Sequence, residues 1–404
     1  STERVAALTV NNSGALEVET TAATTADEQN GIFAVGDVSI SSAGGDLTVN
    51  KAIDTQSDST TALTLAETGS SGAITLNADI TTVGDQTYSG DQSGSHDVVI
   101  AGDVTLETTG TDRDIDFTGN TASATGTQTL TLVTDGAMTH AGALEVDELA
   151  LQGTASYTLA DTGNQIGLLA AGAAGERIPE LTLANSAALE VGTIGAQSGI
   201  LASGDISLTV NNAGLTVSEA IDTTSTSTQA NDSANAITIA NTGGSGVSDI
   251  NAGITTPGDI EFAGKTNITG ATVESAEAGI TISGSGGTLS GGAKLKTDTP
   301  SNDADKIVFS GDNITISGAT TAVETTDGPI TVSGDGFTLE NNATVQSSSG
   351  AVSINGDNAT LASGATLQTT SSDITIAGDN GSIESAVQTT DGNVILSGSG
   401  IGLD

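Results

Sequence analysis

The chain has no cysteine, no tryptophan and few aromatic residues, and each shortage excludes a class of protein. Without cysteine, it can form neither a disulfide framework nor a thiolate metal site. Two Tyr and five Phe among 404 residues leave few large side chains to fill a thick globular core. Yet 36% of the residues are hydrophobic, so this is not a disordered polar chain.

Basic residues are also scarce. Eight Lys and Arg stand against 50 Asp and Glu, which gives a formal net charge of −42. Nucleic acids and anionic membrane surfaces are bound by clustered basic residues. The chain also lacks a run of about 18 apolar residues that would span a bilayer. We therefore expect no nucleic-acid partner and no membrane insertion, and a medium in which salt or divalent cations screen the charge.

What the sequence has in abundance is a short strand pattern between turns. Triplets of the form aliphatic–Thr/Ser–aliphatic recur along the chain, with Gly, Asn and Asp between them. Alternation with period two places the aliphatic side chains on one face and the hydroxyls on the other. Examples are Leu8-Thr9-Val10, Val38-Ser39-Ile40, Ile74-Thr75-Leu76, Leu181-Thr182-Leu183, Ile237-Thr238-Ile239 and Ile374-Thr375-Ile376.

The triplets belong to a repeat that is clearest near the C-terminus. Ile330, Val352 and Ile374 recur at an interval of about 22 residues, and Val394 follows slightly sooner. One such period without a helical pattern is one coil of a β-solenoid, whose aliphatic side chains are buried against neighbouring coils. The predicted fold is all-β: a single-stranded parallel β-helix with about 20–22 residues per coil. Gly-Asp and Gly-Asp-Asn steps supply the corners, where positive φ and side-chain-to-backbone bonds are needed.

A longer duplication overlies this short repeat. LTVNNSGALEV at 8–18 returns as LTLANSAALEV at 181–191, and NADITTVGD at 77–85 returns as NAGITTPGD at 251–259. We expect one continuous solenoid over residues 1–404. Its sequence blocks are 1–170, a duplicated block 171–275, and the most regular repeats at 276–404.

One stretch resembles a known family. Gly84-Asp85-Gln86-Thr87-Tyr88-Ser89-Gly90 leads into VVIAGDVTL at 98–106, then DIDFTG at 114–119 and SYTLADTGNQI at 156–166. These segments are similar to the repeats of filamentous-haemagglutinin-like bacterial exoproteins and related large surface adhesins. The resemblance covers about 80–170 and returns at 258–262. It implies a secreted, right-handed β-helix at the cell surface, and says little about a ligand.

The candidate site is a column of aspartates in the repeated corners. Asp335, Asp357 and Asp379 recur at the same interval as the aliphatic residues, and Asp312 lies one interval before the first. In a stacked solenoid their carboxylates would follow one another at about the strand spacing, where like charges repel. Two interpretations remain open: Asp as a turn residue facing water, or calcium bridging successive coils. No cofactor is otherwise required.

No other group of residues indicates catalysis. His96 and His140 are isolated, so they suggest neither a zinc site nor a base–nucleophile pair. Tyr88 and Tyr157 lie inside repeat motifs, and there is no Trp to form a sugar platform. The basic residues are scattered (Arg4, Lys51, Arg113, Arg177, Lys265, Lys294, Lys296 and Lys306). We expect that the protein is not an enzyme.

The sequence thus predicts an extracellular or cell-surface, non-catalytic fibre or matrix segment that self-associates. The alternative is an adhesin passenger domain that binds a cell-surface or glycan ligand. Irregular insertions at about 20–30, 91–97 and 223–234 are where an adhesive site is expected. The first residues lack the basic and apolar regions of a signal peptide, and residue 404 falls within a repeat. We therefore expect the chain to be a piece of a longer protein.

Overall fold

The computed structural model describes residues 4–19, 31–69, 72–90, 97–119, 121–123, 127–173, 175–224, 236–298 and 306–403. Every regular element in these residues is a β-strand, and the chain divides into two units, Ser1–Leu201 and Ala202–Asp404. No described segment forms a helix long and apolar enough to cross a membrane. Each unit is a parallel β-solenoid, which confirms the predicted fold class.

The strands of unit 1 form three faces. The first face contains β1 (Leu8–Asn12), β4 (Val38–Ser42), β7 (Leu63–Glu67), β10 (Gln86–Ser89), β13 (Ile115–Phe117), β16 (Met138–His140), β18 (Tyr157–Leu159) and β20 (Leu181–Asn185). The second contains β2 (Leu16–Val18), β5 (Leu47–Val49), β8 (Ile74–Leu76), β11 (Val98–Ile100), β14 (Thr121–Ser123) and β21 (Leu189–Val191). The third contains β3 (Gly31–Ala34), β6 (Ala52–Thr55), β9 (Ile80–Thr82), β12 (Val104–Thr108), β15 (Thr129–Val133) and β24 (Ile200–Leu201). Two long strands, β17 (Leu144–Gln152) and β19 (Gln165–Ala171), turn the corner and pair in both the second and the third face.

The strands of unit 2 also form three faces. The first contains β25 (Ile206–Asn211), β28 (Ile237–Thr242), β31 (Ile260–Ala263), β34 (Ile280–Ile282), β37 (Ile307–Phe309), β40 (Ile330–Val332), β43 (Val352–Asn355), β46 (Ile374–Ala377) and β49 (Val394–Ser397). The second contains β26 (Leu215–Val217), β29 (Ser248–Ile250), β32 (Thr266–Thr269), β35 (Thr288–Ser290), β38 (Thr315–Ser317), β41 (Thr338–Glu340), β44 (Thr360–Leu361), β47 (Ser382–Ile383) and β50 (Gly402–Leu403). The third contains β27 (Ile221–Asp222), β30 (Ile254–Thr256), β33 (Thr272–Ser275), β36 (Lys294–Thr297), β39 (Ala322–Thr325), β42 (Thr344–Ser347), β45 (Thr366–Thr369) and β48 (Ala386–Thr389).

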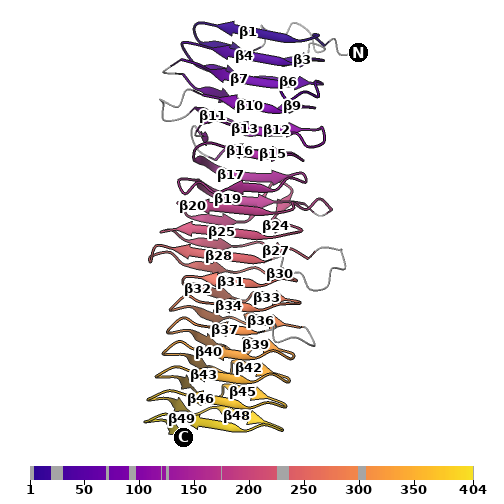
Figure 1. Ribbon diagram of the computed structural model, residues 1–404. Helices are drawn as coiled ribbons and strands as arrows, with labels where there is room; N and C mark the ends of the chain where they lie inside the picture. Colours follow the sequence, from indigo (N-terminus) through magenta and orange to yellow (C-terminus); the bar gives the residue numbers. More distant parts are fainter. Residues whose placement is uncertain are drawn as a thin grey trace. The chain divides into compact units, whose positions relative to one another are not determined.

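Stacking in register builds the core of each unit. Ile330 pairs with Val352, which pairs with Ile374, so each aliphatic side chain lies against its equivalent in the next turn. All three are fully buried, whereas the hydroxyl residues between them point outward. In Figure 1, β40, β43, β46 and β49 lie side by side in this order, as do β42, β45 and β48. The triplet pattern therefore encodes both the strand and its inward face.

The length of a turn varies more than the C-terminal repeats suggest. Val352, Ile374 and Val394 pair across successive turns at the predicted interval of about 20–22 residues. By contrast, the turn from Ile206 to Ile237 is much longer, and the one from Met138 to Tyr157 is shorter. The strands keep their register while the corners absorb the difference, because connections between strands tolerate insertions.

A column of buried hydroxyls lines the end of the third-face strands. In unit 2 these residues pair in register, and several donate to a backbone carbonyl at the corner of the preceding turn. Ser347 Oγ donates to the carbonyl of Gly328 at 3.1 Å, and Thr369 Oγ1 donates to that of Gly350 at 3.0 Å. Buried polar atoms need such partners, since an unpaired one costs about 1–3 kcal/mol. The column contains Thr256, Ser275, Thr297, Thr325, Ser347 and Thr369.

One short hairpin in unit 1 breaks the parallel pattern. Strands β22 (Thr193–Ile194) and β23 (Gln197–Ser198) pair antiparallel. Ile194 packs on Ala150 and Ala170, and Gln197 Nε2 donates to the carbonyl of Leu151 at 2.9 Å. The hairpin therefore covers outward-facing alanines of β17 and β19, a feature that the sequence repeats do not indicate.

Glycine is required at one corner of unit 2 by close approach of the backbone. An added Cβ at Gly356 would lie 2.1 Å from the carbonyl oxygen of Gly334, and one at Gly334 would lie 2.0 Å from that of Gly311. Gly378 and Gly398 repeat this contact in the following turns. Any side chain at these positions would push two stacked turns apart. The repeated Gly before Asp in the sequence is thus a packing requirement.

We predict that Gly356→Ala destabilises the protein by about 2 kcal/mol or more, because the new methyl group overlaps a backbone atom that cannot move without separating two turns. Gly253→Ala is the matched control, since its Cβ would lie 3.6 Å from the nearest atom. Urea unfolding of the full chain measures both. Equal stability of the two variants would contradict the close approach.

Candidate functional site

The four predicted aspartates lie in one column at the corner between the first and second faces of unit 2. The backbone N–H of Asp335 donates to Asp312 Oδ1 at 2.9 Å. The N–H of Asp357 donates to Asp335 Oδ1, and that of Asp379 donates to Asp357 Oδ1, each at 2.8 Å. Ser399 continues the column by donating to Asp379 Oδ1 at 2.8 Å. Each carboxylate therefore caps a peptide group of the next turn.

The residue after each of these aspartates completes the corner. Asn358 and Asn380 have φ near +58°, and Gly336 has φ of +70°. The N–H of Gly336 donates to the Asp357 carbonyl, and the N–H of Asn358 to the Asp379 carbonyl, both at 2.8 Å. Asn and Gly adopt this left-handed conformation at least cost. The Gly-Asp-Asn step thus combines a close approach, a capping carboxylate and a left-handed residue.

The same cap recurs at corners throughout both units. At each one, an aspartate Oδ1 accepts a backbone N–H from the next turn toward the C-terminus. Charge-assisted bonds of this kind are shorter and stronger than neutral ones. Further pairs, acceptor first, are Asp46–Ala73, Asp79–Thr105, Asp85–Asp114, Asp103–Thr129, Asp114–Ala137, Asp135–Thr154, Asp205–Ala236, Asp259–Gly279 and Asp373–Asn393.

Hydrogen bonds of this type favour the ionised carboxylate. The backbone N–H of Ser399 lowers the pKa of Asp379 from its ordinary value, with help from the Ser399 side chain. Asp37 in unit 1 accepts hydrogen bonds from the hydroxyls of Ser57, Ser59 and Thr61, and these lower its pKa as well. The ionised carboxylates of Asp379 and Asp37 are therefore structural parts of their corners.

The hydrogen bonds give the aspartate column a structural role of its own. Within the residues that the structure describes, no group of three or more His, Asp or Glu side chains is placed to hold one metal ion. Calcium bridging of Asp312, Asp335, Asp357 and Asp379 stays a prediction. The hydrogen bonds show that these carboxylates also accept backbone N–H groups of the next turn.

The other residue types considered for chemistry are used in structure. Tyr88 is buried, stacks on Phe117 with ring centroids 5.0 Å apart, and donates to Gln86 Oε1 at 2.7 Å. Tyr157 is buried too, and donates to the carbonyl of Gln152 at 2.5 Å. Burial raises the pKa of both phenols. Neither ring is available as a sugar platform.

The basic residues with described partners form ion pairs with nearby acids. Arg4 pairs with Asp54 at 2.6 Å, and Arg113 with Asp58 at 2.7 Å. Lys296 pairs with Asp298 at 2.7 Å and with Glu274 at 3.2 Å. These pairs are partly exposed, where ion pairs contribute little to stability.

The histidines and insertions fall partly outside the described residues. His140 ends β16, and its Nδ1 bonds to the carbonyl of Gly142. His96 and the insertion 20–30 lie outside the described residues, as does most of 91–97 and 223–234. Asp97 is buried against Gly90 and Gly119. Thr223 is buried and donates to Thr256 Oγ1 at 2.7 Å.

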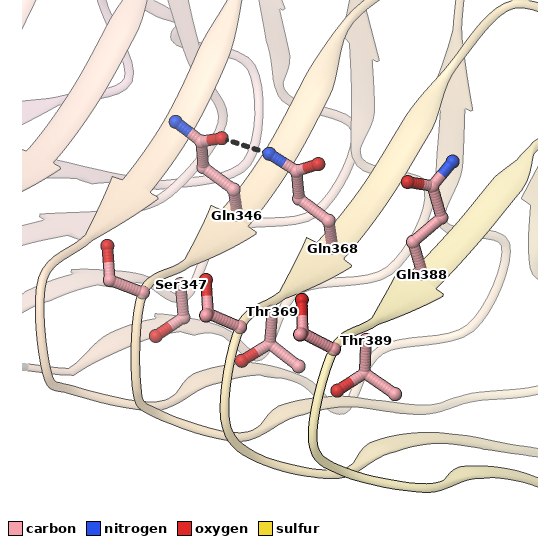
Figure 2. Close-up of a pocket in the computed structure, with 9 residues that line it drawn as sticks. Gln346, Ser347, Gln368, Thr369, Gln388 and Thr389 are labelled. Atoms are coloured by element: carbon pink, nitrogen blue, oxygen red, sulfur yellow. Dashed lines mark hydrogen bonds between the residues drawn. The ribbon is translucent and has the colours of Figure 1, made fainter.

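A polar groove that the repeats alone do not reveal lies on the third face of unit 2. It has a volume of about 240 Å³ and crosses β42, β45 and β48. Figure 2 shows the amides of Gln346, Gln368 and Gln388 in a row above it. The lining takes from each strand a Gln and the hydroxyl residue that ends the strand, together with the hydroxyl residue that follows it: Gln346, Ser347, Ser348, Gln368, Thr369, Thr370, Gln388, Thr389 and Thr390. The signal in the sequence is the recurrence of Gln before two hydroxyl residues.

Comparisons with protein-family models, with curated proteins and with solved structures each find no match to this chain. The resemblance to filamentous-haemagglutinin-like repeats therefore reaches as far as the β-solenoid architecture, which the structure shows.

We predict that Asp357→Ala lowers stability by about 1 kcal/mol, because the N–H of Asp379 loses its acceptor. Asp357→Asn keeps a carbonyl oxygen and removes one charge from a column of like charges, so its stability should stay near that of the parent. Thermal unfolding of the full chain compares the two. An Asn variant as unstable as the Ala variant would show that the charge, and not the cap, matters.

The same unfolding assay tests the calcium hypothesis. Because no three carboxylates in the described residues are placed to hold one ion, we expect the same midpoint in calcium and in chelator at constant ionic strength. Magnesium serves as the control for a general divalent effect. A rise in midpoint with calcium that Asp357→Asn abolishes would establish a bridging ion.

Proposed function

We propose that this chain is a structural, non-catalytic segment of an extracellular fibre or cell-surface matrix filament. The observation that carries this proposal is the in-register repetition within each unit. Val352, for example, meets an equivalent residue on both sides, Ile330 and Ile374. An architecture in which any turn stacks on any other can be lengthened by duplication, as long scaffolds require.

The use of the polar side chains supports a structural role. Asp335, Asp357 and Asp379 accept peptide N–H groups, and Tyr88 and Tyr157 are in the core. Groups that would serve as acids, bases or platforms elsewhere are thus engaged in holding turns together. This supports a non-enzymatic function.

The extracellular setting is part of the proposal and rests on composition. The chain has a net charge of −42, and salt or divalent cations outside the cell would screen this charge. We infer kinship with the filamentous-haemagglutinin-like exoproteins from the Gly84–Gly90 and 98–106 segments. Self-association into a filament belongs to the same proposal, whereas nucleic acid and membrane insertion do not.

An adhesin passenger domain is the second candidate, and one observation favours it. The Gln-rich groove across β42, β45 and β48 is a hollow on an otherwise regular face. A scaffold needs no such hollow. In this alternative the same solenoid would hold a ligand-binding surface away from the cell.

Negative-stain imaging of the native assembly tests the proposed function. We expect long fibres of constant width on the cell surface or in the surrounding matrix. Single rods, each tethered to a cell, would favour the adhesin instead. Compact particles inside the cell would contradict both.

A further inference from the structure

One side of the polar groove is formed by an ordered row of glutamine side chains. Gln346, Gln368 and Gln388 occupy one register position of β42, β45 and β48. Gln368 Nε2 donates to Gln346 Oε1 at 2.5 Å (Figure 2). Gln346 Nε2 in turn donates to Glu324 Oε1 at 2.6 Å. The carboxylate of Glu324 accepts only, so it fixes which way the first amide points, and that amide orients the next.

The ladder leaves hydrogen-bonding capacity unused. A primary amide has two N–H donors and two acceptor positions on its oxygen. The ladder bonds of Gln346 use one donor and one acceptor position, so one of each remains for another molecule. Because these bonds already hold Gln346 and Gln368, a ligand would lose less conformational entropy in ordering those two side chains.

The other side of the groove supplies exposed hydroxyls. Ser347 and Thr369 are buried and bond to backbone carbonyls, so they form the floor. The residue that follows each strand (Ser348, Thr370 and Thr390) is exposed. A row of amides and a row of hydroxyls therefore run together across three strands, and each strand repeats the arrangement at about 4.8 Å.

The charge along the column marks where the groove ends. Before Gln346, the same register position is occupied by Glu274, Lys296 and Glu324. Lys296 is held there by Glu274 and Asp298. The lining residues, by contrast, are all uncharged Gln, Ser and Thr. The neutral groove thus begins after Glu324.

These features define the chemistry of a ligand. The lining residues offer both donors and acceptors but no aliphatic anchor for a peptide side chain. The net charge of −42 disfavours polyanions such as sulfated glycans. A lining that repeats strand by strand suits a polymer of identical units, each with hydroxyls that donate and accept. We propose that the groove binds a neutral linear polysaccharide whose chain crosses β42, β45 and β48 along the stacking direction.

This inference deepens the adhesin alternative by naming a site and a class of ligand. The test titrates the full chain with neutral linear hexasaccharides of glucose, mannose and N-acetylglucosamine, followed by ligand-observed NMR and calorimetry. We expect at least one of them to bind. The double variant Gln368→Met with Thr370→Val, which keeps side-chain volume and removes hydrogen-bonding groups, should weaken that binding at least tenfold.

Two controls make the result specific. Thr331→Val changes an outward hydroxyl on β40 of the first face, so affinity should change less than twofold. If the double variant proves unstable, Thr370→Val alone takes its place. This single variant leaves the amide ladder intact and should still weaken binding. The thermal midpoint of each variant shows whether the fold is retained.

Three outcomes would overturn the inference: no binding of any neutral hexasaccharide, binding that the groove variants leave unchanged, or tighter binding of a sulfated hexasaccharide or a peptide. None of these outcomes would contradict the proposed structural function, because imaging of the assembly tests that function separately. Fibres with an empty groove would leave the scaffold proposal standing and remove this one.

Discussion

The structure depends on parallel strands that stack in register, turn upon turn. A register fixed by one pair, such as Ile354 with Ile376, places every aliphatic side chain of a strand on its equivalent in the next turn. A slip of one residue would turn that whole strand inside out, so the buried face specifies the register strongly. Long solenoids of this kind need little aromatic bulk, because each turn buries its thin core against two neighbours.

The acidic composition follows partly from the same stacking. Where the chain turns a corner, the backbone ladder is interrupted and some N–H groups lack a carbonyl partner within it. Aspartates such as Asp335 and Asp357 accept these N–H groups from the following turn. This capping by aspartate places a carboxylate in turn after turn, and the repulsion between neighbouring carboxylates opposes the stacking. A high negative charge is thus what a solenoid with aspartate-capped corners accumulates as it lengthens.

The sequence predicted the repeat, the strands and the inward residues, because all three follow from periodicity. It also placed Asp312, Asp335, Asp357 and Asp379 in one column, since residues one period apart must stack. It did not predict their hydrogen bonds, because Asp before Asn indicates a turn and not the partner of its carboxylate. The hairpin at Thr193–Ser198 and the groove beside Gln368 were missed for a related reason. Both arise from contacts between turns, whereas a repeat pattern describes one turn at a time.

The register is the central claim, and the absence of cysteine makes it directly measurable by cross-linking. Ser353 and Thr375 face each other on β43 and β46, and both point outward. The double variant Ser353→Cys with Thr375→Cys should form a disulfide rapidly under mild oxidation, since adjacent strands lie within the Cα separation of about 4.4–6.8 Å that the bond requires. The pair Ser353→Cys with Ala377→Cys is displaced by two positions along the strand and should form it far more slowly. Equal rates, or faster cross-linking of the displaced pair, would contradict the register on which this account rests.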